Sequence, residues 1–313
     1  MNEGEILSGA AENGHREGSG ASPRAANPFE DVRARTAIPW VILGGLVLLA
    51  VFYVVALLTP VDAGGPQTFE VLFGLALYGA LATWIVWACR RSDVDLLRLG
   101  GTLHGYDGWS WVRLAGLLVV TMAFSLGSAL VWAYALSYLA PGVLEVLIEA
   151  LSTEPDPAVA YQLAMVVEAI ILAPVLEEAF FRGILVNRWG YRWGVPTALI
   201  ASSIAFGILH ANPIGIGIVG LVAALLYLRT RTLIVPIVFH ATNNLVGIVG
   251  GVLSDASGPL DVAAEIQAAQ DDGALGAILV TVSLPILVWY VIRRWPARDA
   301  ALPYAGADEV DGR

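Results

Sequence analysis

The sequence predicts an all-α, polytopic membrane protein with eight transmembrane helices around a buried polar site. Three observations carry this prediction. The chain of 313 residues is 57% hydrophobic and 14% charged, and its mean hydropathy of +0.71 is too high for a soluble domain with a wetted surface. It contains eight apolar runs near the ~20 residues that cross a bilayer as a helix. Its basic residues occupy alternate connections between these runs.

The predicted helices follow one another along the chain with polar or Gly/Pro-rich connections between them. They are residues 40–58, 71–89, 111–139, 159–186, 195–211, 214–228, 233–253 and 274–292. The fifth and sixth runs are short, which favours a hairpin with its apex at Asn212 and Pro213. Residues 143–151 alternate apolar positions with Glu145 and Glu149 at a helical interval, so we expect a short helix on the outer interface.

The basic residues set the orientation. All 17 are arginines, and apart from Arg182 inside the fourth run and Arg113 at the start of the third, they precede the first helix or follow the second, fourth, sixth and eighth. The connections 59–70, 140–158, 212–213 and 254–273 contain none. Cytoplasmic connections carry the excess of Arg and Lys in membrane proteins. The sequence therefore predicts a multi-pass protein of the cell membrane, embedded in the lipid bilayer, with both termini cytoplasmic.

The chain divides into five segments. Residues 1–37 lack an apolar period and are expected to be a disordered cytoplasmic tail. The others are 38–158 with three helices and the outer helix, 159–253 with four helices, 254–294 with an outer loop and the eighth helix, and the cytoplasmic tail 295–313. The single cysteine, Cys89, excludes an intramolecular disulfide and a cysteine metal cluster. No basic patch or phosphate-binding loop is evident, so no nucleic-acid partner is expected.

Ionisable residues inside apolar runs are costly in a membrane and mark function. The fourth run carries Glu177, Glu178 and Arg182. Glu178 and Arg182 are four residues apart on one helical face, so we expect them to form a structural ion pair. Glu177 points about 100° away, which leaves it free for chemistry. Pro174 is expected to kink this helix near the site.

Two further pairs have the same spacing. Phe206 and His210 share one helical face, and His240 and Asn244 share another. Measured at ~1.5 Å per residue from the cytoplasmic helix ends, Glu177, both histidines and the asparagine reach similar depths near mid-membrane. A lone histidine on an apolar helix is ordinarily a packing residue, but here each has a matched partner. These groups therefore predict one buried polar site, and catalysis is its expected role.

Together these residues resemble a known family. Glu177-Glu178-x-x-x-Arg182, Phe206-x-x-x-His210 and His240-x-x-x-Asn244, in this order on three helices, are similar to the signature of the CAAX-protease and bacteriocin-processing family of intramembrane proteases, which includes the type II CAAX prenyl endopeptidases. The resemblance covers about residues 159–253, which would form the protease core. It implies a buried catalytic cavity open to the cytoplasm and a membrane-associated peptide or protein substrate.

The resemblance also implies roles. Glu177 would be the general base with His210 as its partner in activating water, while His240 and Asn244 would stabilise the oxyanion. Glu178, Arg182 and Phe206 would support them. This is chemically sensible, because peptide hydrolysis needs a base for water and donors for the developing charge. We expect no cofactor. A zinc-dependent version is the alternative, since two carboxylates and two imidazoles are ordinary zinc ligands.

Two other classes of protein use similar features. A non-proteolytic immunity or scaffold protein could hold a partner helix with the same fold. A small transporter could use the buried charges as a proton relay, but no internal repeat of the kind common in transporters is detected. The intact set of motifs favours the enzyme.

Overall fold

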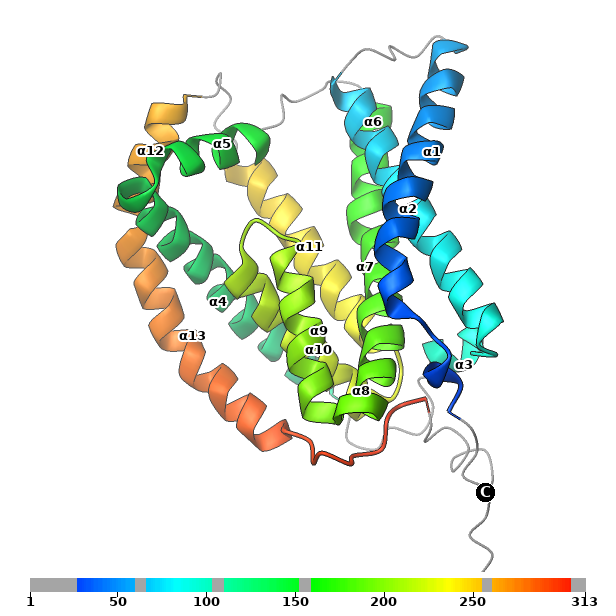
Figure 1. Ribbon diagram of the computed structural model, residues 1–313. Helices are drawn as coiled ribbons and strands as arrows, with labels where there is room; N and C mark the ends of the chain where they lie inside the picture. The colour runs from blue at the N-terminus through cyan, green and yellow to red at the C-terminus, as the bar shows by residue number, and fades with distance from the viewer. Residues whose placement is uncertain (1–26, 60–65, 103–109, 152–158, 255–260, 305–313) are drawn as a thin grey trace, which may run out of the picture.

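The computed structural model describes residues 27–59, 66–102, 110–151, 159–254 and 261–304, and these residues form helices and no strand (Figure 1). The α-helices are α1 Ala37–Leu57, α2 Pro66–Arg91, α3 Leu96–Gly100, α4 Trp111–Leu139, α5 Pro141–Leu151, α6 Val159–Val167, α7 Ala173–Glu178, α8 Asn187–Trp193, α9 Val195–Ile208, α10 Pro213–Thr230, α11 Ile234–Ser254, α12 Val262–Asp271 and α13 Gly273–Arg294. Two 3-10 turns, η1 Pro28–Glu30 and η2 Ala34–Thr36, precede α1, and two π-helical segments, η3 Glu168–Leu172 and η4 Ala179–Val186, flank α7.

All eight predicted apolar runs are helical. Within the described part of the chain, five helices are long and apolar enough to cross a membrane: Ala34–Leu57, Thr68–Arg91, Trp111–Leu139, Pro213–Thr230 and Gly273–Arg294. Two shorter apolar helices are Val195–Ile208 and Ile234–Val249. The remaining run, 159–186, consists of α6, η3, α7 and η4, and α8 continues the same helical path beyond it. These helices indicate a multi-pass membrane protein, while the number of eight crossings stays a prediction.

The first helix shows most plainly that large apolar side chains are exposed on the outside of the bundle. The span Ala34–Leu57, which contains α1, has a mean hydropathy of 2.7, and only 6% of its apolar stretch is buried within the protein. Leu43 and Leu46 are 64% and 60% exposed. An apolar surface of this extent is unfavourable in water but suits contact with lipid tails.

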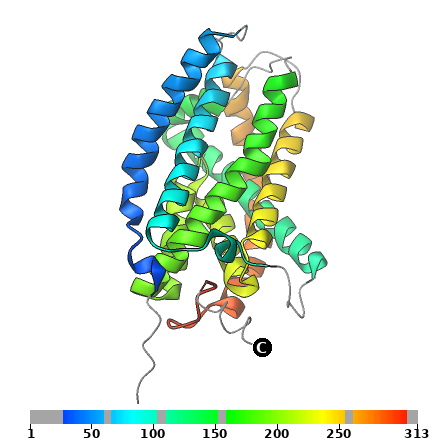
Figure 2. The ribbon, with the colours of Figure 1, turned by 90° about the vertical axis from the view of Figure 1, so that its right-hand side faces the viewer.

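The helices position the polar residues at the middle of the bundle. α1 packs on α2, α9 on α10, and α4 on both α10 and α13. α7 contacts α2 on one side and α11 on the other. Figure 2 shows α2, the helix that contains α7, and α11 side by side. Side chains from α2, α7 and α11 can therefore meet between these helices.

The segment before α1 differs in part from the prediction of a disordered tail, and part of the predicted C-terminal tail also contacts the bundle. Residues 1–26 and 305–313 lie outside the described residues, but 27–36 and 295–304 pack on the bundle. Phe29 and Val32 are 1% and 2% exposed, and the ring of Phe29 meets Tyr304 edge to face with 5.0 Å between centroids. Nε and Nη2 of Arg98 donate hydrogen bonds to the carbonyl of Tyr304. The few apolar residues of these polar segments thus cover the end of the helix bundle.

The connections predicted to lie outside contain more helix than predicted. The expected helix at residues 143–151 is present as α5. The predicted loop 254–273 instead contains α12, while residues 255–260 lie outside the described residues. The Asp261 side chain accepts hydrogen bonds from the backbone N–H groups of Ala263 and Ala264, which caps the first turn of α12. An Asp before the first helical residue indicates a helix start in the sequence, whereas apolar runs alone do not reveal this helix.

Candidate active site

The glutamates lie on a helix whose regular pitch is interrupted twice. Residues 159–193 follow one helical path, with the wider turns of η3 before Pro174 and of η4 after Glu178. A proline inside a helix removes a backbone donor and clashes with the preceding turn. A π-helical turn accommodates this defect, and such turns occur frequently at functional sites. The helix is thus locally widened just before Pro174, while the expected kink stays a prediction.

The widened turn explains the position of Asn244. The N–H of Ala173 donates to the carbonyl of Glu168, five residues earlier. In the same register the carbonyl of Ala169 would accept from residue 174, but Pro174 has no N–H. Nδ2 of Asn244 supplies the missing donor, 2.8 Å from the Ala169 carbonyl oxygen. Asn244 therefore joins α11 to the defect in the helix that carries the glutamates.

The predicted pair of Glu178 and Arg182 is confirmed. Oε1 of Glu178 lies 2.8 Å from Nη1 of Arg182, and both side chains are 1% exposed. Nη2 of Arg182 donates to the carbonyl of Gly220 at 2.9 Å, and the guanidinium lies 4.4 Å from the ring centre of Phe206. The arginine is thus held by a carboxylate, a carbonyl and an aromatic face, which together compensate for its burial.

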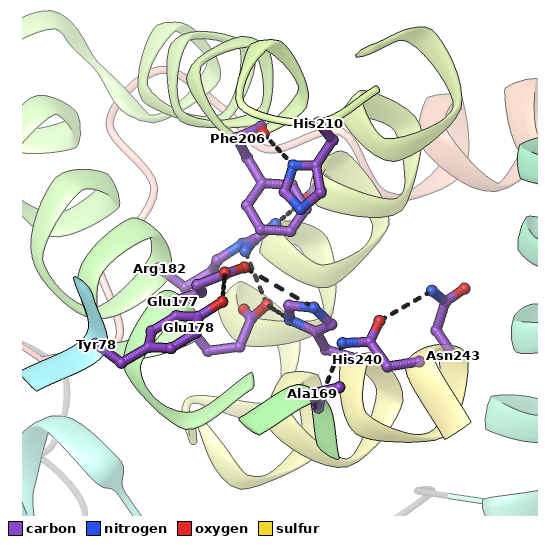
Figure 3. A network of polar contacts seen from close by, with 11 residues as sticks. Tyr78, Ala169, Glu177, Glu178, Arg182, Phe206, His210, His240 and Asn243 are labelled. Atoms are coloured by element: carbon purple, nitrogen blue, oxygen red, sulfur yellow. Dashed lines mark hydrogen bonds and ion pairs between the residues drawn. The ribbon is translucent and has the colours of Figure 1, made fainter. Parts of the chain in front are cut away.

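His240 joins the two glutamates. Its Nδ1 lies 3.0 Å from Oε1 of Glu178, and its Nε2 lies 3.9 Å from Oε2 of Glu177 (Figure 3). An ionised carboxylate can only accept, so Nδ1 carries the hydrogen and the orientation of the ring is determined. With neutral His240, the two carboxylates and Arg182 leave one excess negative charge in a buried cluster. One proton on His240 or Glu177 balances this charge.

Sequence analysis missed Tyr78. This residue of α2 donates a hydrogen bond through its hydroxyl to Oε1 of Glu177 at 2.9 Å (Figure 3). Oε2 of Glu177 is buried and has no hydrogen-bond partner among the described residues. The tyrosine thus orients the carboxylate so that its other oxygen faces Nε2 of His240. The sequence pattern does not mark Tyr78, because α2 carries no second site residue with which it could form a recognisable spacing.

The same face of α2 accommodates Glu168, the first residue of η3. Gly74 lies one helical turn before Tyr78, and a Cβ at position 74 would collide with the carboxylate of Glu168. Glu168 is 6% exposed, and its Oε1 has no hydrogen-bond partner within the described segments. α2 therefore contacts the helix of the glutamates at two carboxylates.

Phe206 and His210 lie on the far side of Arg182. The rings of Phe206 and His210 have centroids 4.8 Å apart, and Phe206 also meets His240 edge to face at 5.6 Å (Figure 3). Nδ1 of His210 hydrogen-bonds to the carbonyl of Phe206 at 2.8 Å. A carbonyl accepts, so Nδ1 carries the hydrogen. In the described structure, His240 is the histidine whose ring nitrogen lies within 4.0 Å of Glu177, and the expected pairing of Glu177 with His210 stays a prediction.

The residues do not form a metal site in this arrangement. Among the described residues, no group of three or more His, Cys, Asp or Glu side chains has the geometry to hold a metal ion. Oε2 of Glu177 and Nε2 of His240 are two suitable donors that face each other, whereas a catalytic zinc takes three protein ligands. Oε1 of Glu178 is already engaged by Arg182 and His240.

Comparison with protein-family models gives a match over the part of the chain that carries most of these residues. Residues 159–246 match the model of a family described as type II CAAX prenyl endopeptidase Rce1-like. The matched segment contains Glu177, Glu178, Arg182, Phe206, His210, His240 and Asn244, whereas Tyr78 lies outside it. Neither the curated proteins nor the solved structures compared with the chain match it. The match supports assignment to the CAAX-protease family.

Proposed function

We propose, from the premise that residues 159–246 carry a CAAX-protease segment, that this chain is an intramembrane endopeptidase acting on a membrane-associated peptide or protein. The observation that carries the proposal is the pair formed by Oε2 of Glu177 and Nε2 of His240. These atoms lie 3.9 Å apart, and each belongs to a side chain that another residue orients. A carboxylate facing an imidazole in a buried site is suited to moving a proton to and from a reacting water.

Glu177 is the proposed general base. A separation of 3.9 Å is too long for a direct hydrogen bond but can be bridged by one water with two ordinary hydrogen bonds. Oε2 would accept a proton of this water as its oxygen attacks the peptide carbonyl, and would return the proton to the leaving amine nitrogen when the C–N bond breaks. The hydroxyl of Tyr78 occupies Oε1, which leaves Oε2 for the water. Nε2 of His210 is the acceptor in its neutral form and would bind the second hydrogen of the water.

His240 and Asn244 are the proposed oxyanion donors. The carboxylate of Glu178 accepts from Nδ1 of His240 and would stabilise the protonated ring, whose Nε2–H would then donate to the developing oxyanion. Asn244 uses one amide hydrogen for the carbonyl of Ala169, and its second amide hydrogen would be the other donor. Arg182 and Phe206 hold Glu178 and the two imidazoles at their positions.

The test of this proposal is peptide hydrolysis by the full chain in lipid vesicles. The substrate is a fluorescence-quenched peptide ending in a CAAX sequence, with and without a prenyl group on its cysteine. Glu177→Gln should lower kcat/KM at least about a hundredfold, because general-base catalysis contributes about 10²–10⁴-fold. Glu265→Gln, which removes an exposed carboxylate of α12, is the matched control and should hydrolyse at the wild-type rate.

Substrate trapping with the Glu177→Gln variant, followed by mass spectrometry, identifies natural substrates. Hydrolysis that persists at the wild-type rate in this variant would exclude Glu177 as the base. Stable capture of the same partner by the wild-type chain without cleavage would instead support a non-proteolytic scaffold.

We also propose that the helices cross the bilayer eight times, with both termini and the mouth of the active site at the cytoplasmic side. The support is the alternation of arginines, since Arg90 and Arg294 end helices on the side opposite Asp271. Single cysteines at positions 294 and 271, in a Cys89→Ala background, test this orientation. A membrane-impermeant maleimide added to intact cells should label position 271 and leave position 294 unlabelled. Labelling of position 294 under these conditions would contradict the proposed orientation.

A further inference from the structure

A cavity of about 680 Å³ lies where the segment before α1 packs against the ends of α2 and α8. Five arginines line it, against two carboxylates, Glu30 and Asp31. The arginines are Arg33, Arg35, Arg91, Arg188 and Arg192. We call this cavity the arginine pocket. Its excess of three positive charges favours an anion, and guanidinium groups bind phosphate oxygens through paired hydrogen bonds.

The arginines come from three segments that the fold brings together. Arg33 and Arg35 precede α1, Arg91 ends α2, and Arg188 and Arg192 are one turn apart on α8. Like charges at this spacing repel each other. Nε of Arg188 donates to the carbonyl of Val32 at 3.0 Å, which attaches the segment before α1 to α8. The five arginines form no ion pair with a carboxylate within 4.0 Å in the described part of the chain, so an anionic ligand would relieve their repulsion.

A second cavity, of about 690 Å³, adjoins the arginine pocket and shares Arg91 with it. It runs along α1 and α2 beside Trp40 and Trp87, and we call it the tryptophan groove. The two indole rings are stacked with 5.0 Å between centroids, Nε1 of Trp40 donates to the hydroxyl of Thr83, and the Arg91 guanidinium lies 5.8 Å from the Trp87 ring. Both helices are long and apolar enough to cross a membrane. The tryptophan groove thus leads from a basic pocket onto a surface suited to lipid tails.

We propose that the arginine pocket and the tryptophan groove together bind one anionic phospholipid of the surrounding leaflet. The arginine pocket takes the phosphate of the headgroup, and an acyl chain lies in the tryptophan groove. Tryptophans gather at the level of lipid headgroups, and basic pockets beside transmembrane helices are suited to anionic headgroups. A zwitterionic lipid carries its own compensating cation, so its phosphate gains less from the arginines. Free phosphate would meet the same arginines but leave the tryptophan groove without a ligand.

The experiment measures lipid binding to the full chain purified in zwitterionic detergent, by native mass spectrometry during titration. The probes are phosphatidylglycerol, phosphatidylcholine of the same acyl length, and inorganic phosphate. Phosphatidylglycerol should bind about tenfold more tightly than phosphatidylcholine, and phosphate at least about a hundredfold more weakly than phosphatidylglycerol. Equal affinity for the two lipids, or phosphate binding as tight as that of phosphatidylglycerol, would overturn the proposal.

Paired variants locate the site. Arg35→Gln with Arg192→Gln removes two exposed arginines of the pocket and should reduce phosphatidylglycerol affinity to that for phosphatidylcholine. Arg293→Gln with Arg294→Gln removes the same charge at the end of α13, where Arg293 also lies over a tryptophan, and should leave the affinity unchanged. Glu30→Gln with Asp31→Asn should raise the affinity severalfold, a gain that misfolding does not produce. Unchanged binding in the Arg35 and Arg192 variant, or an equal loss in the α13 control, would refute the assignment.

Discussion

Glu178 and His240, which belong to different helices, share a hydrogen bond of 3.0 Å between Oε1 and Nδ1. The same carboxylate oxygen accepts from Nη1 of Arg182 at 2.8 Å. Glu178 is therefore the residue through which a local pair on one helix is connected to α11. Its neighbour Glu177 instead contacts α2 through Tyr78. The two adjacent carboxylates thus differ in their partners, and their substitutions should differ in effect.

Glu178→Gln should destabilise the protein by about 3–5 kcal/mol, because it leaves the buried Arg182 without its counter-charge. Glu177→Gln should have a much smaller effect on stability, since the Glu177 side chain is 15% exposed and pairs with no arginine among the described residues. Thermal unfolding in detergent measures both variants. Equal melting temperatures would contradict the separation of roles between the two carboxylates.

Tyr78→Phe should lower kcat more than it raises KM, because the ring remains but the hydroxyl that orients Glu177 is lost. The loss should be about tenfold, which corresponds to the roughly 1–1.5 kcal/mol of one hydrogen bond. Tyr53→Phe on the exposed surface of α1 is the matched control. Steady-state kinetics on the quenched peptide provide the measurement, and a wild-type kcat would remove Tyr78 from the site.

Asn244→Ala should cost about 1–3 kcal/mol of stability, since the carbonyl of Ala169 loses its donor. In a Pro174→Ala background the new N–H can supply that carbonyl, so the same substitution should cost less. A double-mutant cycle by thermal unfolding gives the coupling between Pro174 and Asn244. Additive effects would show that Asn244 does not compensate for the proline.

Gly220→Ala should destabilise the protein by about 1–3 kcal/mol, the typical cost of overpacking. A Cβ at Gly220 would lie 3.0 Å from the Phe206 ring and 3.1 Å from Nη2 of Arg182. Gly247→Ala on α11 is the matched control, because no heavy atom lies within 4 Å of the added Cβ. The melting temperature of Gly220→Ala should be well below that of Gly247→Ala. The reverse order would contradict the close packing of Gly220 against Phe206 and Arg182.

Removal of metal should leave the proposed activity unchanged. If Glu177 acts directly on water, then chelation and dialysis should preserve hydrolysis of the quenched peptide. Elemental analysis should find far less than stoichiometric zinc. Activity that disappears on chelation and returns with added zinc would establish the zinc-dependent alternative and make His240 a ligand.

The sequence by itself determined what depends on local periodicity. Helices are recognisable from apolar runs because each must cover its surface with side chains suited to lipid. Glu178 and Arg182 are four residues apart on one helix, and this spacing brings them together without any knowledge of neighbouring helices. The other motif pairs of the matched segment are also four residues apart, so the sequence alone is enough to recognise them.

The tertiary structure decided which helix faces meet, because the rotation and depth of one helix against another depend on side-chain packing across the bundle. Tyr78 reaches Glu177 only because α2 packs on α7, and no pattern within α2 marks it. His240 hydrogen-bonds to Glu178, and Asn244 donates to the Ala169 carbonyl, which lacks a backbone donor because of Pro174. Both contacts join residues more than 60 positions apart in the sequence. Phe29, from a segment predicted to be disordered, and Tyr304, from the predicted C-terminal tail, meet because burying their rings against the bundle end removes apolar surface from water.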